Sequence, residues 1–549
     1  MAKITGAPLL WAAVLVFVAA CYAKRTEEII STTSGPVQGA VLPSTAGPVR
    51  TYLGIPFAEP PVGEQRFKKP RPKKPWKDVL NATLMPPLCP QFHIHFNSFL
   101  QVKPSDAMSE DCLFLNVFAP AKADSIPKAV IAYFHGGAFS YAGIGMKMFD
   151  ASELAARGGV VVVTVAYRLG ALGFLNLGTE DAPGNMGLYD QLLAMRWVKA
   201  NARAFGGDPN AITLMGQSAG AISIGFHLIS PLSKRLFRRA IMQSASPFTS
   251  SAVSKKDQSV HRAKLLMSHL NCDRDGTREL SLKDAVLCLR SKSSKAILDA
   301  TSQFTTFGLD GFFPVIGQEF VPEEPASALR HVKLNAEELL TGAYEAEGDA
   351  FIRFILKTLL NTDDIGDLRK SQMVILMKTL GASLLRSDPD PIVEKYFSHI
   401  AASDGKGAVY AAADLAGHNQ FSCPTFYFAR GFVRPNTTVY VYEASQGPSS
   451  TGLPKWVRPT HADDIVLSLG SILSLAANVS EADESATKMF INMVSTFSRS
   501  GVPKVSENTP WPKFNDGEQY MHLSDGGNVV KKRPLQSICN FWNKVEPYE

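Results

Sequence analysis

The alternation of short apolar runs with helix-like stretches is the feature that most constrains this fold. The runs are near-continuous, which is typical of strands covered on both faces of a sheet. Strands separated by helices join through right-handed crossovers, so the pattern predicts an α/β protein with a large, mostly parallel central sheet flanked by helices. We find no internal repeat and expect a single domain over residues 24–549. Gly187–Phe205 is one helix-like stretch, and the predicted strands are Ala129–Phe134, Val160–Ala166, Ala211–Met215, Ala240–Met242 and Thr438–Tyr442.

The composition supports a large buried core and excludes several classes of protein. Apolar residues make up 45% of the 549 residues and charged residues 19%, a balance that excludes a disordered or collagen-like chain. The formal net charge of +6 is small for this length. A dedicated nucleic-acid binder normally concentrates lysine and arginine on one face. We therefore expect no block of like charges and no nucleic-acid partner.

The first residues predict secretion. Lys3 precedes an apolar run from Pro8 to Ala20, and Cys21-Tyr22-Ala23 places small residues where a signal peptidase requires them. The run is shorter than a membrane span, so residues 1–23 are predicted to be a cleaved signal peptide rather than an anchor. No later run of about 18 apolar residues follows, and the polar C-terminus resembles neither a retention signal nor an anchor tail. We expect a soluble, extracellular chain without a membrane anchor.

The cysteines agree with an oxidising compartment. One of the seven cysteines would leave with the signal, and an even number remains, which predicts disulfides with 15 possible pairings. Loop closure favours sequential neighbours, namely 89–112, 272–288 and 423–539. Sequons at Asn81, Asn436 and Asn478 are candidate N-glycosylation sites. The six cysteines are Cys89, Cys112, Cys272, Cys288, Cys423 and Cys539.

The most specific chemical signal is the single G-x-S-x-G motif, which covers residues 216–220. It follows a predicted strand (AITLM) and precedes a helix-like stretch (AISIGFHLI). A sharp strand-to-helix turn needs small neighbours and lifts the serine hydroxyl above the sheet edge, while the helix N-terminus favours developing negative charge. Ser218 is therefore the predicted nucleophile, and a plain tight turn is the alternative interpretation.

A second glycine motif predicts an oxyanion hole. His135-Gly136-Gly137-Ala138 directly follows the predicted strand AVIAYF and matches the H-G-G-x type. The backbone N–H groups of Gly136, Gly137 and Ala138 can join that of Ala219 in stabilising a tetrahedral oxyanion. His135 precedes the nucleophile, which is the wrong chain order for the base, so we expect it to shape the loop.

With these motifs, the chain resembles the type-B carboxylesterase and cholinesterase family of α/β-hydrolases over almost its whole mature length. The resemblance implies the α/β-hydrolase fold, with the site at the C-terminal ends of the strands, and the three sequential disulfides. It also implies structural ion pairs between Arg66 and Glu110 and between Arg168 and Asp190. The further matching segments are Arg66-Phe67, Ser109–Leu113 with Asn116, Tyr167–Gly170, Gly184–Gly187 with Asp190-Gln191, Phe205–Pro209 and Gln243–Pro247.

The base of a Ser, Asp or Glu, His triad must follow the serine in this chain order. Spacing alone cannot choose among the eight histidines after the serine, but His461 follows the predicted strand TVYVY and resembles the family's histidine motif. The segment departs from that motif at Arg458 and Ala462, where glycines are usual, and at Asp464, where glutamate is common. The eight histidines are His227, His261, His269, His331, His399, His418, His461 and His522.

The acid is identified only through the resemblance. Glu347 matches the family's triad carboxylate, whereas the residues alone leave Glu345 and Asp349 open as rivals. Ser244 matches a family serine near the triad, so it is either a hydrogen-bonding neighbour of the triad or a buried structural hydroxyl. Gln217 is the other residue that we expect beside the triad.

The resemblance also bears on the substrate. In cholinesterases the first disulfide loop presents a tryptophan to a quaternary ammonium group. Here the loop holds Phe92, Phe96 and Phe99, with Val102 ten residues before its second cysteine, and Gln217 replaces the glutamate that precedes the serine in cholinesterases. These differences favour small, neutral carboxylic esters with an apolar part. The glutamine also resembles the juvenile-hormone-esterase subgroup, and cholinesterase-like specificity is the other alternative.

The leading hypothesis is a secreted serine carboxylesterase that forms an acyl-enzyme on Ser218. A non-catalytic adhesion or binding protein of the same family is the second hypothesis, and a sequestering protein with slow deacylation is the third. No metal motif, P-loop or dinucleotide fingerprint is found, so we expect no cofactor. The oligomeric state stays open.

Overall fold

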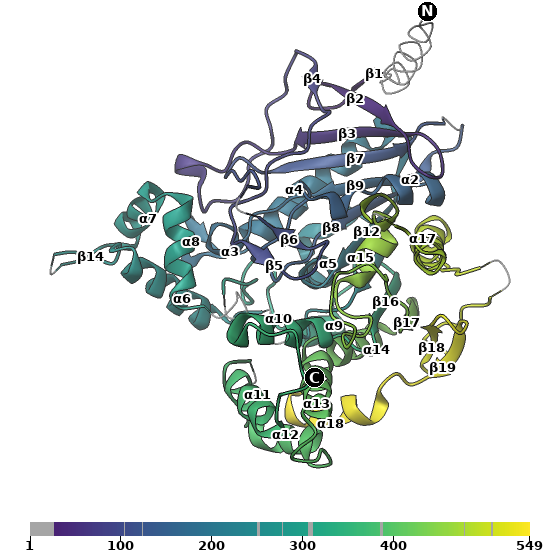
Figure 1. Ribbon diagram of the computed structural model, residues 1–549. Helices are drawn as coiled ribbons and strands as arrows, with labels where there is room; N and C mark the ends of the chain where they lie inside the picture. The colour runs from purple at the N-terminus through teal and green to yellow at the C-terminus, as the bar shows by residue number, and fades with distance from the viewer. Residues whose placement is uncertain are drawn as a thin grey trace, which may run out of the picture.

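In the computed structural model, the predicted signal segment 1–23 lies outside the described residues. Within the described residues, one thirteen-stranded sheet runs through the molecule (Figure 1). Its order is β1-β2-β3-β7-β9-β8-β12-β13-β16-β17-β18-β19, with β4 paired to β2. The described residues are 27–103, 105–122, 125–249, 253–276, 278–305, 311–384, 388–476, 478–506 and 509–548.

The strands of this sheet follow one another along nearly the whole chain. Three two-stranded hairpins lie outside it: β5 (Ile94–His95) with β6 (Gln101–Val102), β10 (Asn176–Thr179) with β11 (Ala182–Pro183), and β14 (Arg274–Asp275) with β15 (Arg278–Glu279). The strands of the large sheet are β1 (Glu27–Ser31), β2 (Pro36–Leu42), β3 (Val49–Pro56), β4 (Leu80–Asn81), β7 (Phe114–Pro120), β8 (Lys128–Phe134), β9 (Val161–Val165), β12 (Gly207–Gln217), β13 (Arg239–Gln243), β16 (Glu338–Tyr344), β17 (Thr438–Ala444), β18 (Gln519–Leu523) and β19 (Val529–Lys532).

The middle of the sheet is parallel and its edges are antiparallel. All pairings from β9 across to β18 are parallel, whereas β1, β2, β3 and β7 form an antiparallel edge and β19 closes the other edge. The five predicted strands correspond to β8, β9, β12, β13 and β17, which all lie in the parallel part. The prediction of a large, mostly parallel sheet is thus confirmed. The sequence marks these strands because strands covered on both faces carry continuous apolar runs.

Helices cover both faces of the sheet (Figure 1). Alternate residues of one strand point into two different cores: Val130 and Ala132 of β8 belong to one cluster, Ile131 and Tyr133 to the other. The first face packs against α4 (Met186–Asn201), α5 (Ala219–Ile229) and α14 (Cys423–Phe432), with α9 (Pro325–His331) beside the last two. The second face packs against α2 (Ser152–Gly158) and α17 (Glu481–Ser500), with α15 (Asp463–Ser468) against α17.

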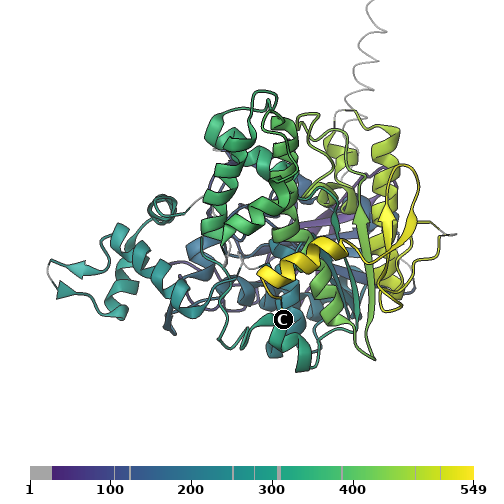
Figure 2. The ribbon, with the colours of Figure 1, turned by 90° about the horizontal axis from the view of Figure 1, so that it is seen from below.

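The remaining helices form two groups beyond the ends of the strands (Figures 1 and 2). Trp542 of α18 donates a hydrogen bond from its indole N–H to the Tyr396 hydroxyl of α12 at 2.8 Å, which ties the C-terminal helix to the second group. The first group is α6 (Lys256–His269), α7 (Leu282–Ser291) and α8 (Ser294–Ser302). The second is α10 (Asp349–Leu360), α11 (Lys370–Leu384), α12 (Pro389–Phe397), α13 (Gly405–Gly417) and α18 (Gln536–Val545), and the short helices α3 (Gly170–Phe174) and α16 (Ile472–Leu475) lie elsewhere.

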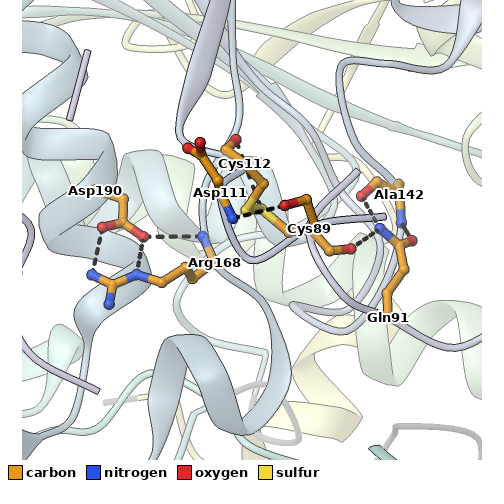
Figure 3. The surroundings of a disulfide bond; sticks show 8 residues. Cys89, Gln91, Asp111, Cys112, Ala142, Arg168 and Asp190 are labelled. Carbon is orange, nitrogen blue, oxygen red and sulfur yellow. Dashed lines mark hydrogen bonds and ion pairs between the residues drawn. A yellow bond between two sulfur atoms is a disulfide. The ribbon is translucent and has the colours of Figure 1, made fainter. Parts of the chain in front are cut away.

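The six cysteines form three disulfides in the pairs that loop closure favours. The Cys89–Cys112 bond lies near a buried ion pair in which Arg168 and Asp190 are 2.7 Å apart (Figure 3). Arg66 and Glu110 form the other expected ion pair. The disulfide closes the 89–112 loop, and the Arg66–Glu110 pair holds its second end.

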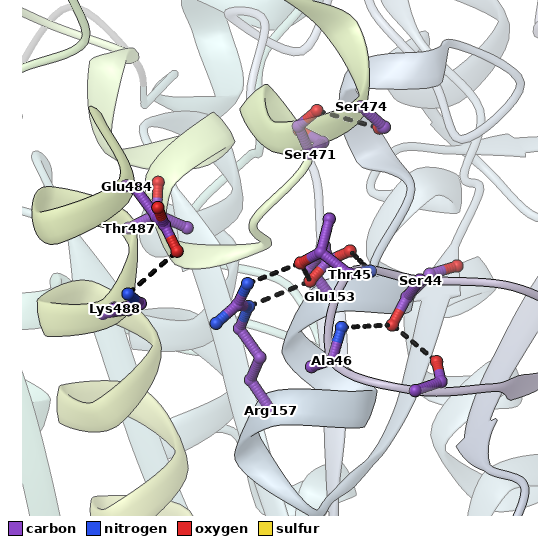
Figure 4. A network of polar contacts seen from close by, with 12 residues as sticks. Ser44, Thr45, Ala46, Glu153, Arg157, Ser471, Ser474, Glu484, Thr487 and Lys488 are labelled. Atoms are coloured by element: carbon purple, nitrogen blue, oxygen red, sulfur yellow. Dashed lines mark hydrogen bonds and ion pairs between the residues drawn. The ribbon is translucent and has the colours of Figure 1, made fainter. Parts of the chain in front are cut away.

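A further polar network joins the β2–β3 turn to α2 (Figure 4). The buried carboxylate of Glu153 accepts hydrogen bonds from the N–H of Thr45 at 2.6 Å, from its hydroxyl at 2.7 Å and from the Arg157 guanidinium at 3.0 Å. The network satisfies a carboxylate that would otherwise be costly to bury. Among the described residues, no helix combines the length and apolar character needed to cross a membrane.

Candidate active site

The predicted nucleophile lies at a sharp turn between β12 and α5. Ser218 has φ 56° and ψ −124°, and its N–H donates to the Gln243 carbonyl of the neighbouring strand β13 at 2.9 Å. Its own carbonyl accepts the first hydrogen bond of α5, from Ile222 at 3.0 Å. A non-glycine residue with positive φ is strained, and such strain is typical of functional turns.

The two glycines of the motif are required by close backbone contacts. A Cβ on Gly220 would lie 2.0 Å from the Phe134 carbonyl oxygen at the end of β8, and one on Gly216 would lie 2.7 Å from the Gly220 carbonyl carbon. Neither position can therefore hold a larger side chain without moving the sheet. This crowding is the physical reason for the G-x-S-x-G pattern at this strand end.

The second glycine motif lies directly beside the serine. A Cβ on Gly136 would approach the Ser218 Cβ to 3.0 Å, and Gly137 has φ +103°. In the described part of the chain, no group accepts a hydrogen bond from the N–H of Gly137 or Ala138, and Ala219 is the first residue of α5, where the N–H has no partner inside the helix. These N–H groups are thus available to a developing oxyanion.

The side chain of His135 contacts the backbone of this loop. Its ring is buried, stacks on Tyr167 with centroids 4.4 Å apart, and has Nδ1 2.8 Å from the Gly136 carbonyl oxygen. The Tyr167 hydroxyl donates to the His135 carbonyl at 2.7 Å. Burial lowers the pKa of His135 to about 4, so the ring is neutral at physiological pH. Gln91 holds the far end of the loop, because its side chain bonds both the N–H and the carbonyl of Ala142 (Figure 3).

The structure brings Glu347 and His461 together although 114 residues separate them. Glu347 Oε2 lies 2.7 Å from His461 Nδ1, and Glu347 Oε1 accepts the Tyr344 N–H at 2.7 Å. The hydroxyl of Thr460 donates to the Ala346 carbonyl at 2.7 Å, which fixes the histidine loop against the loop after β16. A carboxylate that accepts Nδ1–H leaves the lone pair of Nε2 facing the other way.

The two rival carboxylates point elsewhere. Glu345 is half exposed and lies 2.8 Å from Nε2 of His522 on β18. Asp349 is buried and accepts the Arg458 guanidinium at 2.7 Å and the Arg458 N–H at 3.0 Å. Arg458, one of the departures from the family motif, thus anchors the histidine loop through this ion pair.

Two aspartates after the histidine are buried near the Glu347 carboxylate. Burial, opposed by a hydrogen bond from the Thr460 N–H, raises the pKa of Asp463 to about 8. Burial and the neighbouring Glu347 charge raise the pKa of Asp464 well above its usual range. Burial thus favours the protonated form of both aspartates, and Glu347 is the one carboxylate of these three that has an oxygen within hydrogen-bond distance of His461.

Two neighbours of the imidazole bear directly on its chemistry. Gln217 Nε2 lies 3.3 Å from His461 Nε2, and the ring of Phe421 stacks on the imidazole with centroids 3.9 Å apart. Phe421 belongs to a π-helical turn, His418–Ser422, and its position was missed because nothing in the sequence marks that turn. Among the described residues, Ser218 Oγ makes no hydrogen bond. The Gln217 amide instead faces the lone pair of His461 Nε2, which is the atom that would accept the serine proton.

Ser218 and His461 line the same narrow cavity, with a volume of about 90 Å³. The described residues that line it include His461 but no aspartate, glutamate, lysine or arginine. Its walls hold six aromatic side chains, from Phe96, Tyr141, Phe149, Phe313, Phe351 and Phe421. The cavity can therefore bury an apolar, uncharged group beside the serine.

Other predicted residues lie outside the cavity wall. Val102 is buried in β6, and Phe92 lines a neighbouring hollow that shares Tyr141 with the cavity. Ser244 is buried with φ 56°, and its hydroxyl bonds to none of the described residues, so the expected hydrogen bond near the triad is not seen. The backbone of Ser244 instead bonds to the Gly342 carbonyl at 2.8 Å.

One group in the described ranges has the composition of a metal site. Ligand atoms of Glu345, Glu443 and His522 lie within 4.8 Å of one another. Each side chain already has a protein partner, since Glu345 pairs with His522 and the Tyr520 hydroxyl donates to Glu443 at 3.1 Å. The group lies two residues from Glu347 but does not line the cavity.

Comparisons with known proteins show similarity over nearly the whole chain. The model of the carboxylesterase family matches residues 26–542. The acetylcholinesterase of Bungarus fasciatus is 32% identical over 556 residues, which cover 98% of this chain and 90% of the relative. The acetylcholinesterase of Leptinotarsa decemlineata is 31% identical over 544 residues, which cover 94% and 86%. The similarity spans almost the whole length of both chains in each case.

Proposed function

This chain belongs to the carboxylesterase family, whose members are serine ester hydrolases, and on that premise we propose that it hydrolyses neutral carboxylic esters through an acyl-enzyme on Ser218. The observation that carries the proposal is the arrangement of three parts around one cavity. A strained serine, a histidine held by a buried carboxylate, and free backbone N–H groups are the parts that acyl transfer requires.

The proposed mechanism assigns one task to each group. Ser218 Oγ attacks the ester carbonyl while His461 Nε2 takes its proton, and the imidazolium then protonates the leaving alcohol. Glu347 holds Nδ1–H and stabilises the imidazolium. The N–H groups of the 136–138 loop and of Ala219 stabilise the oxyanion, where each donor contributes about 10²–10³ in rate. A water molecule, activated in the same way, then hydrolyses the acyl-enzyme.

The arrangement of the base suggests a movement before attack. The Gln217 amide must release His461 Nε2 for the serine hydroxyl to reach it. Because Gln217 is buried and faces the cavity, the carbonyl group of an entering ester is the natural competitor for this amide. We infer that substrate entry completes the hydrogen bond between serine and histidine, as is common for catalytic bonds that are open in unliganded enzymes.

The cavity favours an uncharged substrate. A quaternary ammonium ester would gain from the aromatic walls, but the described residues that line the cavity offer it no carboxylate, and Gln217 is neutral. An apolar acyl or alcohol group gains from the same walls by burial alone, at about 25 cal/mol per Å². Juvenile-hormone-like esters satisfy this requirement, as do simple aryl esters.

We further propose that residues 1–23 are a cleaved signal peptide, that residues 24–549 form one domain, and that the protein is secreted. The three disulfides are typical of an oxidising compartment, which supports secretion. The asparagines of the three sequons are exposed and are proposed glycosylation sites. No observation favours the binding-protein alternative, whereas the contact between Glu347 and His461 supports the proposed enzyme.

A panel of esters tests the proposal. We expect neutral aryl and alkyl esters to be hydrolysed with kcat/KM at least a hundredfold above that for acetylcholine and butyrylcholine. The Ser218→Ala variant should lose this activity while keeping its thermal unfolding midpoint. A preference for choline esters would contradict the substrate class. A single burst of product without turnover would instead favour the sequestering protein.

A further inference from the structure

A basic segment lies outside the cavity and has no part in the proposed chemistry. Residues 68–77, KKPRPKKPWK, hold six of the chain's 56 lysines and arginines. This segment corrects the expectation that the chain has no block of like charges, because the small net charge of +6 conceals it. The six are Lys68, Lys69, Arg71, Lys73, Lys74 and Lys77.

Three prolines and several hydrogen bonds hold this segment in an extended path along the surface. Pro72 forms an isolated antiparallel bridge with Ala58. The Lys73 N–H donates to the Phe57 carbonyl at 3.2 Å. Trp76 donates its backbone N–H to the Ser34 carbonyl at 2.8 Å. Nine extended residue steps span at most about 30 Å, so the charges form a long, preorganised row.

The first part of the row forms one wall of a surface groove with a volume of about 570 Å³. Lys68, Lys69 and Arg71 line it together with Lys256, the first residue of α6. The N-terminus of α6 adds its own positive dipole to this wall. The groove also contains acidic groups, described next, but the basic ones outnumber them.

The acidic groups of the groove are Glu180 and Glu319. Lys69 is held by Glu319 and lies over the Tyr189 ring, with its ammonium 4.4 Å from the ring centroid. Lys68 pairs at 3.0 Å with Asp181 beside the groove. These contacts fix two of the lysines and leave the groove with a net positive charge.

Four basic side chains along the row and groove form no ion pair with the described residues, although the Glu59 carboxylate accepts the backbone N–H of Lys74 at 2.8 Å. Arg71, Lys74, Lys77 and Lys256 are exposed, and in the described ranges no carboxylate oxygen lies within 4.0 Å of their cationic groups. Lys73 is different, because Glu59 lies 3.4 Å away. An exposed row of unneutralised charge on a rigid support concentrates acidic ligands and is opposed by salt.

We propose that residues 68–77 and this groove bind an extended acidic polysaccharide, with sulfate or carboxylate groups along its chain. A nucleic acid would need exposed aromatic faces for its bases, but Tyr189 is covered by Lys69, and the Trp76 indole is half-buried with its N–H bonded to the Pro36 carbonyl at 3.0 Å. A membrane would favour apolar side chains for insertion, and the groove wall is polar apart from Pro183 and the covered tyrosine. The choice among polyanions rests on the proposed secretion, since acidic polysaccharides are extracellular.

Two matched variants of the full-length secreted protein test this site on immobilised heparin. The first is Arg71→Glu with Lys74→Glu and Lys77→Glu. The control reverses three exposed lysines elsewhere, Lys504→Glu with Lys513→Glu and Lys532→Glu, and changes the net charge equally. Hydrolysis of a neutral aryl ester shows that both variants are folded, because neither set contacts the catalytic cavity.

We expect the wild type and the control to stay bound to heparin at about 0.15 M salt, which is the physiological ionic strength. The first variant should bind heparin at least tenfold more weakly. The slope of log affinity against log salt should fall by about 2 to 3, since each lost contact releases about 0.7–0.9 counterion fewer. Equal losses in both variants would show an effect of net charge alone and overturn the site. Tighter binding of wild type to phosphatidylserine vesicles or to single-stranded RNA than to heparin would overturn the assignment to a polysaccharide.

Discussion

The Glu347→Gln substitution separates the proposed role of this carboxylate from simple packing, because glutamine has nearly the same shape. In the wild type the two carboxylate oxygens accept two different donors, the Tyr344 N–H and the His461 Nδ1–H, each at 2.7 Å. A glutamine side chain has one acceptor oxygen and one NH₂ group. One of the two donors must therefore face another donor or change its protonation.

The expected loss in kcat depends on which of the two donors changes its hydrogen bond. The backbone N–H cannot change, and placing the new NH₂ against it would cost about 1–3 kcal/mol in this buried position. The imidazole can change, by moving its proton from Nδ1 to Nε2, and the NH₂ can then donate to Nδ1. His461 Nε2 then carries a proton and cannot accept one from Ser218. The expected loss in kcat is about 10⁴-fold, equivalent to about 5 kcal/mol of transition-state stabilisation.

The assay compares kcat for a neutral aryl ester in three proteins: wild type, Glu347→Gln and Glu345→Gln. The last is the matched control, because Glu345 lies two residues away, is half exposed and pairs with His522 instead. We expect it to keep activity within about threefold, since exposed ion pairs contribute little. A Glu347→Gln variant with kcat within tenfold of wild type would contradict this role of Glu347, as would an equal loss of activity in both variants at an unchanged unfolding temperature.

Three further predictions concern residues around the imidazole. Ala462 has φ 75°, so Ala462→Gly should stabilise the fold by about 1 kcal/mol in urea unfolding, and a destabilised variant would contradict the strain. Burial raises the pKa of Asp463 to about 8. Between about pH 4 and 8 the folded state therefore keeps a proton on Asp463 that the unfolded state has lost. Through this group, the free energy of unfolding should fall by up to about 1.4 kcal/mol per pH unit as pH rises. Asp463→Asn should make the slope shallower by this amount and leave the part that the buried Asp464 contributes, and an unchanged slope in the variant would count against the raised pKa of Asp463. Gln217→Glu places a carboxylate beside His461 Nε2 and should move the acidic limb of the pH–rate profile up by about one unit; an unmoved limb would exclude this contact in solution.

The buried parallel strands were predictable from the sequence, whereas the edges of the sheet were not. Strands such as β8 and β9 are covered on both faces and carry unbroken apolar runs. Strand β1 (EEIIS) and strand β19 (VVKK) lie at open edges and carry charges, so no apolar run marks them. Strand β16 is buried, but its sequence ELLTGAY is interrupted by a threonine and a glycine.

Some parts of the candidate site were likewise predictable from the sequence, and others were not. Ser218 and the 136–138 loop were predictable because backbone crowding at a strand end demands glycine, and glycine is visible in a sequence. The pairing of Glu347 with His461 depends on two loops 114 residues apart, which no local pattern encodes. The stacking of Phe421 depends on a π-helical turn with no sequence signal. The contact between Gln217 and the imidazole likewise follows from side-chain placement alone.

The most direct measurement is the intact mass of the protein after reaction with a small organophosphate, followed by mapping of the modified peptide. We predict one phosphyl group per chain, attached to Ser218, complete loss of esterase activity in step with labelling, and no adduct on Ser218→Ala. A protein that stays unlabelled, or one that carries the adduct on a different residue, would contradict the claim that this serine is the nucleophile.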